Sequence, residues 1–131
     1  ETTLVYLAGA LDGNGFFTIQ RSYRTKGKRY ESHRPTYYIA KVGFTGTIGE
    51  EVQYLLKELF GGSVYHHQPT NAAHKPWTVW QATDKRARTA AEALLPYLRI
   101  KKRQAALIVE FTDLCARQWA EIKANKSPLI G

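Results

Sequence analysis

The stretch Leu7-Ala8-Gly9-Ala10-Leu11-Asp12-Gly13-Asn14-Gly15 decides the fold, and it extends the apolar lead-in Leu4-Val5-Tyr6. Its apolar residues recur at helical spacing, which predicts a helix from about Leu4 to Gly13 with one apolar stripe. The small residues Ala8, Gly9 and Gly13 would let a second helix approach this one closely. Gly13 and Gly15 predict that the helix ends there, so that Asp12 and Asn14 lie just before the next strand.

The composition limits the class of protein. A chain of 131 residues, 44% hydrophobic and 12% aromatic, is long enough for one domain with a core of its own, residues 1–131. A formal net charge of +8 favours a polyanionic partner, nucleic acid before an anionic membrane surface. A basic protein without such a partner is the alternative that charge alone leaves open.

Cysteine usage and hydropathy indicate an intracellular protein. One cysteine, Cys115, excludes an internal disulfide and a cysteine-based zinc site. That fits a reducing compartment, either a bacterial or archaeal cytoplasm or an organelle. The apolar stretch from Leu4 to Leu11 is too short to span a membrane and follows no basic segment, so we expect neither a signal peptide nor a membrane partner.

The hydrophobic pattern further along the chain alternates between two periods. Period-two segments predict four strands, at Phe16–Arg24, Thr36–Thr45, Ser63–Gln68 and Trp77–Thr83. Helical periods predict helices at Val52–Phe60, at Lys85–Leu95 with Asp84 as its cap, and from about Ile100 onward. We therefore predict an α+β fold in the order α-β-β-α-β-β-α. Its four-stranded antiparallel sheet would carry helices on one face and leave the other uncovered.

Two motifs together resemble the LAGLIDADG homing endonucleases. The first is the nonapeptide, through Leu7-Ala8-Gly9, Asp12-Gly13 and the closing Gly15. The second is the run Leu94-Leu95-Pro96-Tyr97-Leu98 followed by Lys101, which is similar to the Pro-aromatic-Leu run and lysine that many relatives carry near the last helix. The two motifs lie at both ends of one domain, so the resemblance covers nearly the whole chain. It implies the LAGLIDADG fold with its four-stranded DNA-binding sheet. One motif per chain implies a homodimer.

The resemblance also implies an activity. It is sequence-specific cleavage of double-stranded DNA at a long pseudo-palindromic site, as in intron or intein homing, with two or three Mg²⁺ ions per dimer. Family members carry a metal-binding acid where this chain has Asn14, which places the metal at Gly13 and Asn14. Mg²⁺ favours carboxylate oxygens, and asparagine keeps only a neutral one. We therefore expect cleavage by this chain to be impaired.

The remaining site residues follow from the resemblance for Lys101, and from the small residues of the first helix and the polar face of the predicted strands for the others. Lys101 matches a lysine thought to act on the catalytic water or the developing charge; a solvated lysine in a basic run is the alternative. The predicted dimer interface is Leu7, Ala8, Gly9, Leu11 and Asp12, although a cap is the favoured role for Asp12. The predicted DNA-binding residues are Thr18, Gln20, Ser22, Arg24, Lys26, Lys28, Arg29, Tyr37, Ile39, Lys41, Gly43, Tyr65, His67 and Gln81.

Two other classes of function stay open on the sequence. A relative that binds DNA or intron RNA without cutting, like a maturase, would fit the neutral Asn14. A transcriptional regulator could use the same fold. A His-Asn-His nuclease is not favoured, because neighbouring His66 and His67 alternate faces in a strand and cannot hold one metal together.

Overall fold

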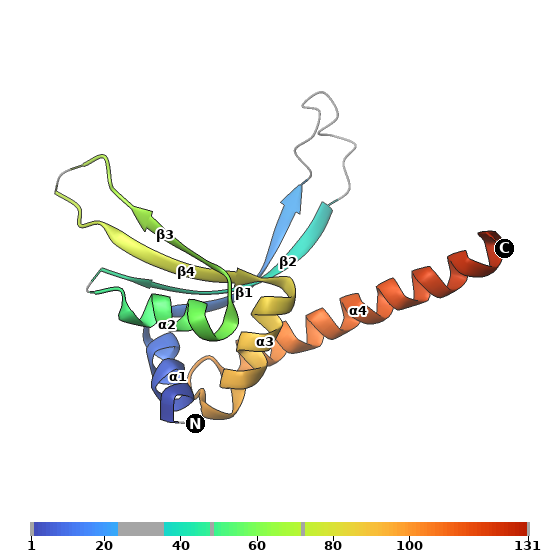
Figure 1. Cartoon of the computed structure of the whole chain (residues 1–131), viewed down its shortest axis with the longest axis horizontal. Helices are drawn as coiled ribbons and strands as arrows, with labels where there is room; N and C mark the ends of the chain where they lie inside the picture. The colour runs from blue at the N-terminus through green and yellow to red at the C-terminus, as the bar shows by residue number, and fades with distance from the viewer. Residues whose placement is uncertain (1, 24–35, 48, 72, 131) are drawn as a thin grey trace.

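The computed structural model describes residues 2–23, 36–47, 49–71 and 73–130 (Figure 1). Its helices are α1 (Thr2–Asn14), α2 (Glu51–Phe60), α3 (Asp84–Leu94) and α4 (Lys102–Ile130), with a 3-10 turn, η2, at Leu95–Tyr97. Its strands are β1 (Gly15–Tyr23), β2 (Thr36–Gly46), β3 (Ser63–His67) and β4 (Trp77–Thr83). This is the predicted α+β order, with a short turn added before the last helix.

The strands form one four-stranded antiparallel sheet in the order β1-β2-β4-β3. Helices α1, α2 and α3 lie against one face, and both hairpins extend away from them (Figure 1). Strand residues buried beneath the helices include Phe17, Ala40, Val42, Phe44, Trp80 and Ala82. The prediction that one sheet face stays free of helices is therefore confirmed.

We call the face away from the helices the open face. Because side chains alternate along a strand, the register assigns its members. They are Phe16, Thr18, Gln20, Tyr37, Ile39, Lys41, Gly43, Thr45, Ser63, Tyr65, His67, Trp77, Val79, Gln81 and Thr83.

Helix α1 is held against the sheet by its apolar stripe. Leu7, Ala8 and Leu11 have no exposed surface, while Leu4 packs at the edge of the same core. Besides the sheet, α1 also contacts α3 and η2. The opposite side of α1 carries the exposed residues Val5, Tyr6, Gly9 and Gly13.

Helix α2 ends where the sequence predicts. Gly61 has a positive φ of 76° and its N–H donates to the carbonyl of Lys57, 2.8 Å away. The Gly61 carbonyl accepts a hydrogen bond from the indole nitrogen of Trp80, also at 2.8 Å. Trp80, the residue that the sequence places in the core, is fully buried.

Helix boundaries differ from the prediction at several places: α1 spans Thr2–Asn14 and α2 begins at Glu51, each slightly longer than predicted. Asp84 does not cap α3 through its side chain; it begins that helix with a φ of 52°. Helix α3 stops at Leu94 because Pro96 and its neighbours form η2 instead. Helix α4 begins at Lys102 rather than Ile100 and projects beyond the sheet (Figure 1). Among the described residues, none of the helices combines the length and apolar character needed to cross a bilayer.

Candidate nucleic-acid interface and α1 end

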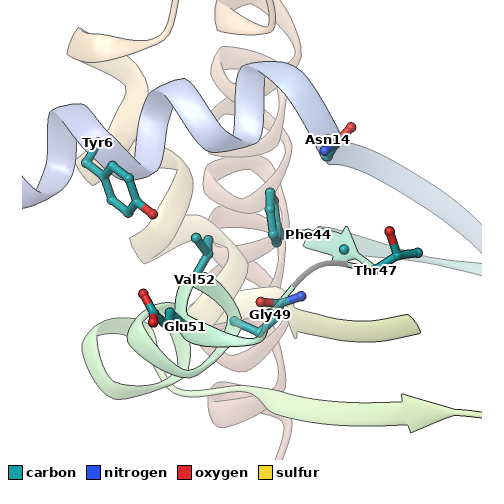
Figure 2. A pocket seen from close by; sticks show the side chains of 9 residues that line it. Tyr6, Asn14, Phe44, Thr47, Gly49, Glu51 and Val52 are labelled. Atoms are coloured by element: carbon teal, nitrogen blue, oxygen red, sulfur yellow. The ribbon is translucent and has the colours of Figure 1, made fainter. Parts of the chain in front are cut away.

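The end of α1 places Asn14 at the surface. Asn14 is the last residue of the helix, its side chain is exposed, and β1 starts directly after it. It lines a cavity of about 390 Å³ between α1, the end of β2 and α2. Figure 2 shows Tyr6 and Asn14 on the α1 side of this cavity and Glu51 and Val52 on the α2 side.

Asp12, two residues earlier, binds the backbone of residues 99–101, which lie just before α4. Its carboxylate accepts hydrogen bonds from the backbone N–H groups of Arg99 at 2.8 Å, Ile100 at 3.1 Å and Lys101 at 3.0 Å. Partial burial raises the pKa of this carboxyl. The three N–H donors and the nearby positive charge of Lys101 lower it by a larger amount, so the pKa lies below its usual value. The favoured prediction, that Asp12 is a cap, is confirmed.

Lys101 in turn binds the backbone at the end of α1. Its ammonium group donates to the carbonyl of Leu11 at 3.1 Å and to that of Gly15 at 2.6 Å. A cation at the carboxyl end of a helix is favourable because the helix dipole is negative there. The Asp12 carboxylate thus binds the backbone of residues 99–101, and the Lys101 ammonium binds the backbone at the end of α1. We call these two sets of hydrogen bonds the Asp12–Lys101 clamp. Lys101 is partly buried rather than a freely solvated lysine.

The donor set at the α1 end does not fit a strong Mg²⁺ site within a single chain. Asn14 and Gly13 offer only neutral oxygens, and the carboxylate of Asp12 already accepts three backbone hydrogen bonds. The Lys101 ammonium lies on neighbouring carbonyls and would repel a cation. Among the described residues, no group of three or more His, Cys, Asp or Glu side chains could hold a metal ion.

A buried amide that the sequence analysis missed also lines the cavity. Gln53 of α2 is only 2% exposed and donates from Nε2 to the carbonyl of Thr78 at 3.0 Å. A Cβ at Gly46 would lie 3.0 Å from that nitrogen, so glycine leaves room for the Gln53 side chain. A polar residue on the core stripe of a predicted amphipathic helix was the signal that could have identified it.

The open face gathers most of the predicted DNA-binding residues. Thr18, Gln20, Tyr37, Ile39, Lys41, Tyr65, His67 and Gln81 all belong to it by register. Gly43 belongs to it too, but the ring of Phe16 lies where its Cβ would be, so Gly43 serves packing there. His67 stacks on Trp77 with ring centroids 3.8 Å apart, whereas His66 faces Tyr54 on the other side.

Five predicted DNA-binding residues are placed incompletely or not at all. Ser22 pairs with Tyr37 in the sheet register, which assigns its backbone position only. Arg24, Lys26, Lys28 and Arg29 lie outside the described residues.

The predicted dimer interface needs correction. Leu7, Ala8 and Leu11 are fully buried within their own chain, so they cannot contribute surface to a partner. The Asp12 carboxylate is engaged by residues 99–101 of the same chain. Of the five predicted residues, Gly9 alone lies on the exposed side of α1. The helical spacing of apolar residues could not by itself tell which side of α1 packs on the sheet.

Comparison with solved structures identifies the architecture. The homing endonuclease I-CvuI superposes with a TM-score of 0.66 at 19% identity, over 86% of this chain and 66% of its own. The LAGLIDADG homing endonuclease I-GzeII gives 0.64 at 16% identity, over 88% of this chain and 36% of its own. The chain has the LAGLIDADG homing endonuclease fold. I-CeuI, a group I intron-encoded homing endonuclease, agrees, with a TM-score of 0.63 at 18% identity over 92% of this chain and 58% of its own.

These likenesses concern structure rather than close sequence. No protein-family model matches the chain, and no curated protein matches it. The chain spans at most about two thirds of the I-CvuI, I-CeuI and I-GzeII chains. All three of those structures hold DNA, and I-CvuI was crystallised with 2 mM Mg and, in another structure, with 2 mM Ca.

Proposed function

We propose that the chain is a DNA-binding subunit of the homing endonuclease type, which contacts a long duplex site with its open face. The observation that carries this proposal is a sheet face free of helices, in a fold that homing endonucleases bound to DNA share. A net charge of +8 supplies attraction to the phosphates. The strand side chains supply groups that can reach base edges in the major groove.

The active unit in this proposal is a homodimer joined along the exposed side of α1. A Cβ added at Gly9 or Gly13 would meet nothing within 4 Å, so the fold of the single chain does not require glycine at either position. Glycine inside a helix costs about 1 kcal/mol relative to alanine. Close approach of a second α1 would explain both glycines. Val5 and Tyr6, 50% and 56% exposed, would be buried beside them.

Cleavage belongs to the same proposal in an impaired form. In the dimer the two Asn14 side chains would lie at the α1 ends, beside the phosphates at the centre of the site. Mg²⁺, when bound, would polarise the scissile phosphate and supply hydroxide. The neutral Asn14 weakens the hold on such ions, which prefer carboxylate ligands. Lys101 would place a positive charge near the reacting phosphate while it anchors the end of α1.

A second candidate is a relative that binds DNA or intron RNA without cutting it. The neutral end of α1 favours it, since Asp12 is fully occupied by backbone donors. A chain that needs only to bind loses nothing when two carboxylates near phosphates become amides.

Selection from a random duplex library tests the proposal. We expect recovered sites to be pseudo-palindromic, because a two-fold dimer presents the same open face to each half. Competition with structured intron RNA separates duplex binding from the RNA-binding form of the second candidate, and cleavage of a selected duplex separates the DNA-binding form. RNA that displaces every selected duplex at equal concentration would contradict the first and favour the second.

A further inference from the structure

The open face differs from an ordinary basic DNA-binding surface in the kind of side chain it carries. Within the described strands its single cation is Lys41, and it holds no arginine. Arg21 pairs with Tyr38 in the register and therefore belongs to the helical face. Arginine and lysine are the usual readers of guanine, because they donate to both O6 and N7. The described strands therefore offer little for reading G·C pairs.

Two amides on this face are placed to read bases. Gln20 of β1 is exposed and lies opposite Ile39, while Gln81 of β4 is half-buried and lies opposite Gly43, where the ring of Phe16 fills the space of a side chain. Within the part of the chain that the structure describes, neither amide makes a hydrogen bond. A glutamine can donate to N7 and accept from N6 of adenine at once, a pairing that guanine cannot offer.

The rest of the face is apolar to a degree that suits thymine. Tyr37, on the inner strand β2, is 44% exposed, and Tyr65, on the edge strand β3, is 51% exposed. Ile39 and Val79 add partly exposed aliphatic surface between them. Thymine is the one base that presents a methyl group in the major groove, where apolar side chains contact it favourably.

We propose that the described strands read predominantly A·T pairs, with Gln20 and Gln81 each contacting an adenine and Lys41 the side chain suited to a guanine. This inference rests on the duplex binding proposed above and adds the sequence class of the half-site. In a two-fold dimer each contact occurs once in each half, so the preferences appear as symmetric positions.

Substituting each glutamine by arginine tests the inference, because it should change the base that is preferred at the contacted position. Gln20→Arg and Gln81→Arg are compared with the parent chain by duplex selection. Each variant is expected to change one position per half-site from adenine to guanine, with a preference of roughly five- to 150-fold, the range for one bidentate contact. Gln118→Arg is the matched control, because it adds the same charge at an exposed position of α4, which contributes no residue to the open face. It should strengthen binding to all duplexes without changing any base.

The outcomes separate this inference from the function beneath it. Sites that are rich in A·T under the sheet, together with both base changes, support the inference. Selected sites rich in G·C at those positions, or unchanged preferences in both variants, overturn it while duplex binding stands. A parent chain that enriches no duplex at all overturns the inference and the proposed function together.

Discussion

At the scale of single residues, the Asp12–Lys101 clamp joins residues 86 to 90 positions apart in the chain. Asp12 satisfies three backbone N–H groups just before α4, and Lys101 satisfies two carbonyls around the end of α1. The two signature motifs are therefore partners in space. The two motifs can therefore occur together because they hold the fold together, in addition to any role in catalysis.

The clamp predicts a loss of stability on Asp12→Asn. One acceptor oxygen and the charge are lost while three donors remain, so we expect the free energy of unfolding at neutral pH to fall by about 1–3 kcal/mol. Urea unfolding measures it. Glu121→Gln, an exposed change on α4, is the control and should change stability by less than about 0.5 kcal/mol.

The pH dependence of that loss follows from the lowered pKa of Asp12. A carboxyl whose pKa is lower in the folded state stabilises the protein above its unfolded pKa, for which 3.8 is the reference. That contribution disappears as the pH falls through the folded value. The parent chain and Asp12→Asn should therefore differ at pH 7 and converge in strong acid. A difference that grows as the pH falls would contradict this role.

At the scale of elements, α1 has two unlike sides. The stripe of Leu7, Ala8 and Leu11 fixes the helix on its own sheet, and the side of Gly9 and Gly13 faces outward. The same short segment can therefore serve the core and an interface without conflict.

This division predicts opposite effects of one substitution. Gly9→Leu should leave the chain folded, because its Cβ enters open space. It should shift the dimer to monomer, because the bulk prevents close approach of the second α1. Sedimentation velocity measures the change, with Glu121→Leu as a control that adds the same side chain on α4. A parent chain that is monomeric both alone and on its duplex would exclude the interface.

The elements also show how far sequence reasoning reaches. Strand alternation predicted the open face and helical period predicted the four helices, because both depend on neighbours in the chain. The start of α4 was placed too early because Asp12, a distant residue, satisfies the amides of residues 99–101. Leu7, Ala8 and Leu11 were assigned to the interface, although they pack in the core of their own chain, because an apolar stripe does not say whether its partner is a sheet or another chain. Gln53 was missed because its partner, the carbonyl of Thr78, belongs to another element.

At the scale of the whole molecule, a chain with a net charge of +8 has an open sheet face that is mostly neutral within the described strands. Of 19 lysines and arginines, Lys41 is the one on the described open face. General attraction to DNA and base reading would then come from different parts of the surface.

This separation predicts a steep salt dependence with little change in base preference. Neutralising six to ten phosphates would lower duplex affinity by about 10³- to 10⁵-fold between 50 and 200 mM salt. Fluorescence anisotropy on a selected site and on a scrambled duplex measures both quantities. Lys41→Met should weaken the base preference at the position that Lys41 contacts. It should change the salt dependence of duplex affinity only slightly. Affinity that hardly changes with salt would show that the attraction is not electrostatic.

The central claim is that the α1 end is a homing endonuclease active site weakened at Asn14. Its most direct test is cleavage of a selected duplex with Mg²⁺ by the parent chain and by Asn14→Asp, with Asn14→Ser as a neutral control. We predict that Asn14→Asp cuts at least on the order of 100-fold faster, as restored electrostatic contacts in catalytic sites do. The parent chain and the control should bind without appreciable cutting. Rapid cutting by the parent chain, or none by Asn14→Asp on a tightly bound site, would contradict the claim.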